Sequence, residues 1–363
     1  MVSGSNISLL HNILPELAAW LRAVAKRQIN KQQAFRIQKI QDERIARAQK
    51  REARAEALLD SGTLGAEQEG LVIAHYGTQL DVEALQGEQA GQLFRCHLRT
   101  NLEQLVTGDR VIWQPALDAE IGVVSALMPR RSLLTRPDPY GKLKPVAANI
   151  DRILLVIAPL PIPSASLVDR YLVACEIVGI SPVILLNKAD LVDESNRNEL
   201  TTMLDEFRHI GYEVRHTAAL DGQLGDLLGF INGRTVVFVG QSGVGKSSLV
   251  NALLPDVQQK TAEISANSQL GQHTTTTARL FHLPGGGELI DSPGIREFGL
   301  WHITREQLLE GFVDFRPFLG SCRFRNCAHA SEPGCALRAA VAGGELSARR
   351  LESYHKLAEG LER

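Results

Sequence analysis

The order of two short motifs constrains this chain more than any other feature of its sequence. A phosphate-binding loop of the form G-x-x-x-x-G-K-[ST] occupies residues 240–247, and a guanine-reading N-K-x-D motif occupies residues 187–190. In an ordinary GTPase the phosphate loop comes first and the base-reading motif follows it. Here the order is reversed, so either one motif is a coincidence or the GTPase domain is circularly permuted.

The phosphate loop has the local context that its chemistry needs. Residues 235–239 form a β-branched apolar run typical of a buried strand, and residues 246–253 favour a helix that ends before Pro255. Backbone N–H groups and the helix N-terminus would then point at the phosphates. We therefore expect Lys246 to reach the β- and γ-phosphates and the Ser247 hydroxyl to bind Mg²⁺.

Three further segments complete the set of motifs. Residues 289–294 form a strand that ends in D-x-x-G, and the polar run 271–277 supplies hydroxyls where a switch I threonine belongs. Any of its four threonines could bind Mg²⁺, and we take Thr275. Residues 217–219 fit the short loop that caps guanine O6 through a backbone N–H. The five motifs follow the usual GTPase order, cut once and rejoined, which favours permutation over coincidence.

The residues expected to bind the nucleotide all lie in these motifs. They are Asn187, Lys188, Ala189, Asp190, Ala218, Gly240, Gln241, Ser242, Gly243, Val244, Gly245, Lys246, Ser247, Ser248, Thr275, Asp291 and Gly294. The expected Mg²⁺ ligands are Ser247, Thr275 and Asp291. The Asp190 carboxylate would accept hydrogen bonds from guanine N1–H and the 2-amino group, and adenine offers neither donor there.

Hydrolysis needs a water molecule held in line with the γ-phosphate. In Ras-like enzymes a glutamine just after D-x-x-G orients this water, but the residue here is Ile295, whose side chain cannot do so. We therefore expect His273, beside the switch I threonines, to be catalytic together with Lys246. A catalytic histidine in a flexible loop predicts slow intrinsic turnover that rises when a partner orders the loop.

A cysteine and histidine cluster lies near the C-terminus. Three of the five cysteines fall in one C-x4-C-x-H-x5-C run, made of Cys322, Cys327, His329 and Cys335. Cys3His is a usual structural zinc set, and with four protein ligands no coordination position is left for water. Three cysteines cannot all pair with one another, which argues against disulfides. We predict one structural Zn²⁺.

The motif order, the loop sequence GQSGVGKSSL at residues 240–249 and the cysteine–histidine run together resemble the ribosome small subunit-dependent GTPase A family. The likeness extends from about Lys26 to the C-terminus. It implies a cytoplasmic GTPase that binds the small (30S) ribosomal subunit and its 16S rRNA and assists late maturation, alongside other 30S assembly factors. It also implies ribosome-stimulated hydrolysis of GTP to GDP, and it supports the role of His273.

Two alternatives stay open at this point. One is an RNA-binding, nucleotide-sensing assembly protein with little intrinsic catalysis, although intact Lys246, Ser247 and Asp291 argue against it. The other is a GTPase that acts on another RNA, such as tRNA, which a basic arm and a barrel would also suit.

The expected architecture is multidomain. Residues 65–128 contain short strands separated by turns and predict a β-barrel; the pattern fits an OB-fold or an SH3-like barrel equally well, and the resemblance implies the OB-fold. Residues 129–299 would form the central α/β circularly permuted P-loop GTPase domain. Residues 300–363 would form a mostly helical zinc-binding domain that contains the knuckle.

The N-terminal residues differ from the rest in composition. Residues 25–64 are rich in Lys and Arg and predict a helical or disordered arm that orders on RNA, although a solvated linker helix is the alternative. Residues 1–24 are apolar, but Pro15 and Glu16 interrupt them and no basic segment precedes them, which argues against a signal peptide. We expect a non-native extension that comes from an overlong start assignment.

Basic residues in these regions are the candidates for RNA contact. They are Lys26, Arg27, Lys31, Arg36, Arg44, Arg47, Arg95, Arg99, Arg110, Arg130, Arg131, Arg323 and Arg325. The sequence contains no apolar run long enough to span a membrane. It also lacks heptads and large apolar faces, so a monomer is expected.

Overall fold

The computed structural model describes residues 64–361 except 78, 100–101, 118–120, 139–140, 219–223, 256–277, 293–294, 296–297 and 301–302. The predicted N-terminal extension and nearly all of the basic arm therefore lie outside the described residues. So do these candidate site residues: Lys26, Arg27, Lys31, Arg36, Arg44, Arg47, His273, Thr275 and Gly294.

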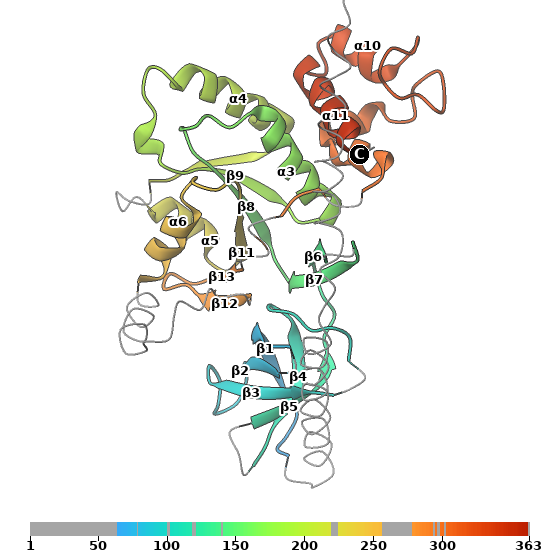
Figure 1. Ribbon diagram of the computed structural model, residues 1–363. Coiled ribbons are helices and arrows are strands. Elements are labelled where there is room, and N and C mark those ends of the chain that lie inside the picture. Colours follow the sequence, from blue (N-terminus) through green and yellow to red (C-terminus); the bar gives the residue numbers. More distant parts are fainter. Residues whose placement is uncertain are drawn as a thin grey trace, which may run out of the picture. The chain divides into compact units, whose positions relative to one another are not determined.

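The first described module is a closed β-barrel (Figure 1). Its strands are β1 (Gln68–His75), β2 (Gln79–Ala84), β3 (Leu93–Leu98), β4 (Arg110–Pro115) and β5 (Ile121–Leu127). β1 pairs with β2 and β4, β2 pairs with β3, and β5 pairs with β4 and, in parallel, with β3. This ring of five strands is the OB-fold arrangement, so the SH3-like alternative is wrong.

The barrel core explains one glycine. Trp113 is fully buried, and a Cβ at Gly70 would lie 2.6 Å from its ring and 2.4 Å from Val82. Only glycine leaves room for an indole this close to the neighbouring strand. The strand β2 alternates buried and half-buried residues, the period of a strand with one face in a core.

The central module is a doubly wound sheet whose strand order demonstrates the permutation. Its strands are β8 (Arg152–Ile157), β9 (Pro182–Leu186), β10 (Glu213–His216), β11 (Thr235–Val239), β12 (Arg279–His282) and β13 (Glu288–Asp291). They lie in the order β10-β9-β8-β11-β13-β12, all parallel except β12. The chain builds β8, β9 and β10 outward before it returns to the central strand β11. A single cut between β13 and β8 accounts for this order.

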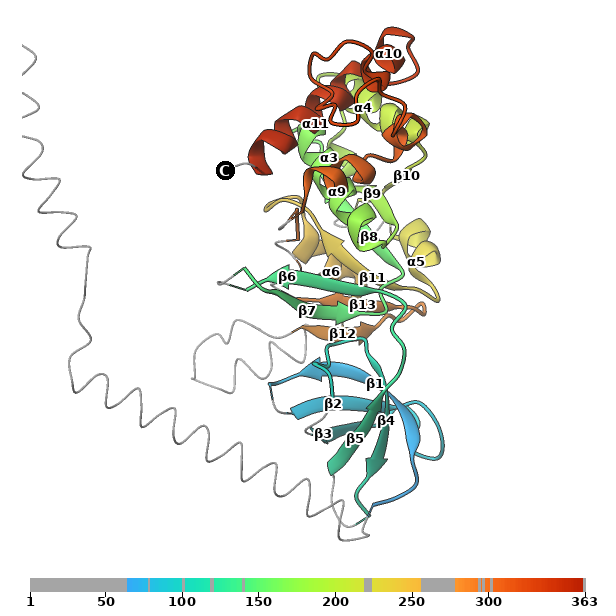
Figure 2. The same ribbon diagram turned by 90° about the vertical axis from the view of Figure 1, so that its right-hand side faces the viewer.

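Helices cover both faces of this sheet (Figures 1 and 2). They are α3 (Ala165–Val178), α4 (Arg197–Ile210), α5 (Gly225–Ile231) and α6 (Lys246–Leu253). In β8, Ile153 and Leu155 pack in one cluster with α3 and α4, whereas Leu154 and Val156 pack in another with α5 and α6. The strand is therefore apolar throughout, as expected for a parallel strand covered on both faces.

Two elements join the barrel to the sheet. A hairpin of β6 (Leu133–Pro137) and β7 (Leu143–Ala148) lies between β5 and β8 in the chain. β12 pairs with β1 of the barrel at Arg279 and Ala74, and His282 Nε2 lies 2.5 Å from the Glu83 carboxylate of β2. We did not predict either connection from the sequence.

The C-terminal module is mostly helical. It contains α9 (Arg305–Gly311), the 3₁₀ helix η3 (Val313–Phe318), α10 (Ala336–Ala342) and α11 (Ala348–Leu361), with the cysteine run between η3 and α10. Thr304 begins α9 with a capping box that includes Gln307. Phe312, Phe315 and Tyr354 form an aromatic core. Among the described residues, no helix combines the length and apolar character that a membrane crossing requires.

Candidate nucleotide site and metal centre

The loop between β11 and α6 has the shape of a phosphate-binding loop. Gly240, Gly243 and Gly245 have φ angles of 135°, 85° and 95°, which favour glycine. Close neighbours restrict two of these positions further. A Cβ at Gly240 would lie 2.3 Å from the Val156 carbonyl oxygen, and one at Gly245 would lie 2.3 Å from Asn187 Nδ2. The loop is thus packed against β8 and against the base-reading motif.

The two motifs that are reversed in the sequence are in direct contact. Asn187 Nδ2 donates to the Val244 carbonyl at 2.9 Å, and Lys188 Nζ donates to the Gly243 carbonyl at 3.0 Å. Asn187 follows β9 and the loop follows β11, so both lie at the carboxyl edge of the parallel sheet. Open α/β sheets bind their ligands at this edge.

The predicted cap lies beside the base-reading motif. The backbone N–H of Ala189 donates to the Thr217 carbonyl at 3.1 Å, and that of Thr217 donates to the Leu186 carbonyl at 2.8 Å. Ala218 is buried, whereas Asp190 is exposed at the same edge. The backbone therefore holds residues 187–190 and 217–218 together as the two sides of one pocket edge.

The phosphate end of the site contains the lysine, serine and aspartate that were predicted there. Lys246 Nζ donates to the Gly240 carbonyl at 2.6 Å and also to the Gln241 carbonyl. Ser247 lies exposed in the first turn of α6. Asp291 ends β13, which is the parallel neighbour of β11, so its carboxylate belongs to the same edge as the loop.

Ile295, which stands where Ras-like enzymes carry their glutamine, belongs to the core. Its side chain is 2% exposed and packs with the same apolar cluster as Phe298. A buried aliphatic side chain cannot hold an attacking water. The polar group for that role must come from another segment, as the sequence predicted.

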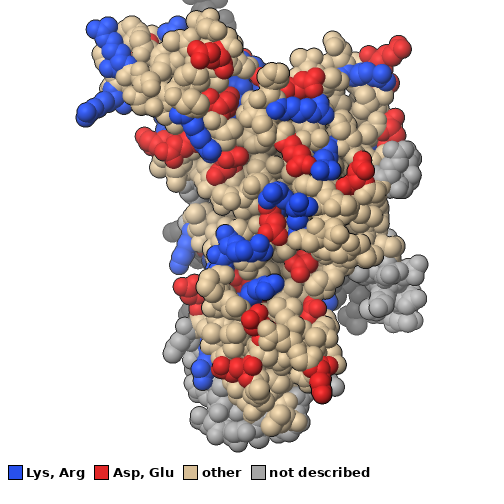
Figure 3. All heavy atoms as spheres, turned by 180° about the vertical axis from the view of Figure 1, so that it is seen from behind, with Lys and Arg blue, Asp and Glu red and all other residues tan. Residues whose placement is uncertain are grey.

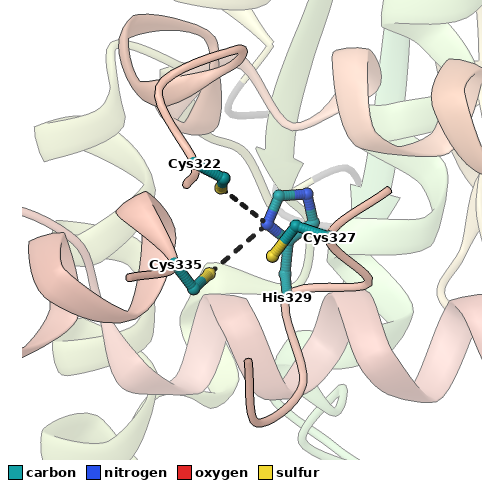
Figure 4. Close-up of side chains that lie close together, drawn as sticks. All are labelled: Cys322, Cys327, His329 and Cys335. Carbon is teal, nitrogen blue, oxygen red and sulfur yellow. Dashed lines mark hydrogen bonds between the residues drawn. The ribbon is translucent and has the colours of Figure 1, made fainter. Parts of the chain in front are cut away.

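The four predicted metal ligands meet in one cluster (Figure 4). Their ligand atoms all lie within 4.8 Å of one another. His329 Nδ1 is 3.5 Å from Cys322 Sγ and 3.4 Å from Cys335 Sγ. Tetrahedral zinc with its usual bond lengths places a histidine nitrogen about 3.5 Å from a cysteine sulfur. The cluster, completed by Cys327, could therefore hold a zinc ion.

Glu332 supports the metal cluster, although the sequence analysis gave it no role. Its carboxylate accepts hydrogen bonds from the backbone N–H groups of Ala328, Ala330 and Ser331, at 2.9, 2.9 and 3.1 Å. Backbone N–H donors, its own first, lower the pKa of Glu332 to about 2. The only signal in the sequence is a carboxylate three residues after a ligating histidine, in a loop that continues with Pro333.

The basic candidates differ in how free their side chains are. Arg130 makes a bidentate ion pair with the buried Asp109 carboxylate, so its guanidinium belongs to the protein interior. Arg131 is 66% exposed in its pair with Asp151. Arg323 and Arg325 are exposed in the cysteine loop. The structure therefore weakens the expectation for Arg130 alone among these four.

Sequence comparison places the chain among known GTPases. A family model described as RsgA GTPase matches residues 127–301. The small ribosomal subunit biogenesis GTPase RsgA of Hahella chejuensis is 56% identical over 340 residues, which cover 93% of this chain and 97% of that protein. The chain belongs to the RsgA GTPase family. The Pseudomonas aeruginosa protein of the same name is 55% identical over 335 residues, with 92% and 97% covered.

Solved structures of the family have the same fold. YjeQ from Thermotoga maritima superimposes with a TM-score of 0.65 at 32% identity, covering 82% of this chain and 99% of that chain. YloQ, described as a circularly permuted GTPase, gives a TM-score of 0.65 at 30% identity, covering 82% and 96%. The predicted architecture of a barrel, a permuted GTPase domain and a C-terminal cysteine–histidine module is confirmed.

Proposed function

We propose that this protein is a GTPase that binds the small ribosomal subunit late in its assembly and hydrolyses GTP with subunit-stimulated turnover. The observation that carries the proposal is the contact of the base-reading motif with the phosphate loop, through Asn187 and Lys188. The names of the relatives, small ribosomal subunit biogenesis GTPases, support the partner. GTP would favour binding and hydrolysis would favour release. A protein that works on assembling subunits would act in the cytoplasm.

The nucleotide would lie along the carboxyl edge of the sheet. Its guanine would meet the Asp190 carboxylate and the backbone of Ala218, and its phosphates would meet the loop and Lys246. Ser247, Asp291 and Thr275 would hold Mg²⁺, which neutralises charge on the β- and γ-phosphate oxygens when it is bound. The edge that contains Lys246, Ser247 and Asp291 fits this role.

His273 is the proposed group that orients the attacking water. The burial of Ile295 supports this assignment, because the position used by Ras-like enzymes carries no polar group here. A histidine nitrogen can accept a hydrogen bond from water and can thereby hold it in line with the γ-phosphate. Stimulation by the subunit would then consist of placing His273.

The C-terminal module is the proposed structural zinc domain, with domain boundaries as predicted at residues 129–299 and 300–363. Zinc would fix the shape of the cysteine loop and so fix the positions of its exposed arginines. Arg323 and Arg325, together with the N-terminal arm, would contact 16S rRNA. The contacts that the loop makes without metal, such as the Ala336 N–H to Cys322 Sγ at 3.3 Å, support a preformed knuckle.

Nucleotide specificity tests the proposed site directly. The wild-type protein should bind GDP at least about 10⁴-fold more tightly than ADP, because adenine would leave Asp190 unpaired. Asp190→Asn should lose GDP affinity and gain affinity for xanthosine diphosphate, since an amide N–H can donate to the xanthine 2-oxygen. Asp226→Asn, an exposed change on α5, is the control and should bind as wild type. Unchanged GDP affinity in Asp190→Asn, measured by calorimetry, would refute the assignment.

A further inference from the structure

A second cleft lies at the edge of the sheet opposite the nucleotide site. Its volume is about 430 Å³, and it is bordered by Asp151, Thr235 and Glu288, which stand at or just before the starts of β8, β11 and β13. Leu71 and Arg110 of the barrel form the facing wall. Because β8, β11 and β13 are parallel, this edge is separated from the phosphate loop by the length of the strands.

Arginines dominate the charge of this cleft. Arg110, Arg131, Arg152 and Arg234 line it; we call this site the arginine cleft. Arg110 and Arg131 are exposed, whereas Arg152 and Arg234 are half-buried. Figure 3 shows Lys and Arg side chains gathered across the middle of one face, with single acidic side chains among them.

The two carboxylates in the cleft do not cancel this charge. Asp151 accepts hydrogen bonds from Arg131 at 2.7 Å and from the backbone N–H of Thr235 at 2.8 Å. Glu288 accepts from the Thr235 hydroxyl at 2.6 Å. Four guanidinium groups thus face two carboxylates that are already hydrogen-bonded, which leaves an excess of two positive charges before His282 is counted.

The chemistry of the lining favours a phosphate backbone. Guanidinium groups bind phosphate oxygens in bidentate geometry and keep their charge at any physiological pH. His282 is the only ring among the lining residues, so the cleft offers no platform for stacked bases. One wall comes from an OB-fold barrel, a fold that binds oligonucleotides. Contacts of this kind position a nucleic acid without reading its sequence.

We propose that the arginine cleft binds a sugar–phosphate segment of RNA. The inference rests on the proposed function in that this RNA would belong to the small subunit. A segment held there would contact the barrel through Arg110 and the GTPase sheet through Arg152 and Arg234. The RNA would therefore touch both modules at the edge that the nucleotide leaves open.

The salt dependence of RNA binding measures this contact. The variants are Arg110→Ala, Arg131→Ala and the double change, with Arg197→Ala on the exposed start of α4 as the matched control. A fluorescein-labelled RNA hairpin is titrated at salt concentrations from about 50 to 200 mM. Thermal unfolding verifies that each variant is folded. Arg131→Lys keeps the charge and separates loss of charge from loss of packing.

Each alanine should lower the slope of log K against log salt by about one, and the double change by about two. At about 0.1 M salt this corresponds to roughly tenfold weaker binding for each arginine. Arg131→Lys and Arg197→Ala should stay close to wild type. Slopes of the two single variants equal to that of wild type would overturn the proposal.

Two further arms separate the other outcomes. If inorganic phosphate raises the unfolding temperature of wild type but not of the double variant, while RNA slopes are unchanged, the ligand is a free anion and the RNA proposal fails. Co-sedimentation with purified small subunits and a non-hydrolysable GTP analogue tests the proposed function separately. If wild type does not sediment with subunits, the function fails, and the hairpin slopes still decide the cleft. If all variants sediment alike at every salt concentration, only the cleft fails.

Discussion

Two glycines of the phosphate loop have neighbours that exclude any side chain. At Gly245 a Cβ would lie 2.3 Å from the Asn187 amide, which itself donates to Val244. A single methyl group would therefore push the base-reading motif away from the phosphate loop. A sequence motif marks Gly245 as necessary for phosphate binding, but only the fold shows that it also gives room to Asn187.

Gly245→Ala should weaken GDP binding by about 2 kcal/mol or more, roughly 30-fold. The left-handed φ costs alanine about 1–2 kcal/mol, and the displaced Asn187 loses a hydrogen bond that contributes about 1 kcal/mol. Gly179→Ala is the control, because its φ is 70° and a Cβ there meets nothing within 4 Å. It should lower the unfolding free energy by about 1 kcal/mol and leave GDP affinity unchanged. Equal GDP affinities for both variants in calorimetry would contradict the packing argument.

The elements of the nucleotide site could be predicted where the signal is local. The apolar runs before the two motifs gave β9 and β11 with their observed bounds, and the glycines and Pro255 gave α6. β12 and the β6–β7 hairpin were missed, because their short runs gain stability only from distant partners such as β1. The OB-type pairing of β3 with β5 is likewise a property of the closed barrel. For the same reason the contact of Lys188 with Gly243 was not foreseen.

The cysteine loop is an element whose shape depends on one carboxylate as well as on its ligands. Glu332→Ala should weaken zinc binding by about 10- to 100-fold, because three backbone N–H groups around His329 lose their acceptor. The lowered pKa keeps Glu332 ionised at every pH used for zinc binding. Competition with a chromophoric chelator measures the affinity. Glu359→Ala, an exposed change on α11, should bind zinc as wild type does; the same affinity in Glu332→Ala would show that the ligands alone shape the loop.

On the scale of the whole described chain, a buried ion network ties the C-terminal helix to the GTPase sheet. Asp169 of α3 is fully buried and accepts from Arg349 at 2.6 Å and from Arg350 at 2.7 Å. Arg350 also pairs with Asp314 of η3, and Arg349 pairs with Glu206 of α4 at 2.5 Å. The metal-binding module is thereby attached to the helices that cover one face of the sheet. Long charged side chains gave no sign of this attachment in the sequence.

Asp169→Asn should lower the unfolding free energy by about 3–5 kcal/mol, because it leaves two arginines without their shared buried partner. Urea denaturation measures the change. The control is Glu352→Gln, which breaks the exposed pair with Lys356 on α11 and should cost no more than about 0.5 kcal/mol. Similar losses in the two variants would mean that the network contributes little to holding the modules together.

GTP turnover tests the central claim most directly. Purified protein is assayed alone, with small subunits and with large subunits at one salt concentration, and His273→Ala is assayed beside it. The account predicts slow turnover by the protein alone and strong stimulation by small subunits only, which the variant lacks. Equal rates of the wild-type protein in all three conditions would contradict the account, because the small subunit would then not be the partner that activates hydrolysis.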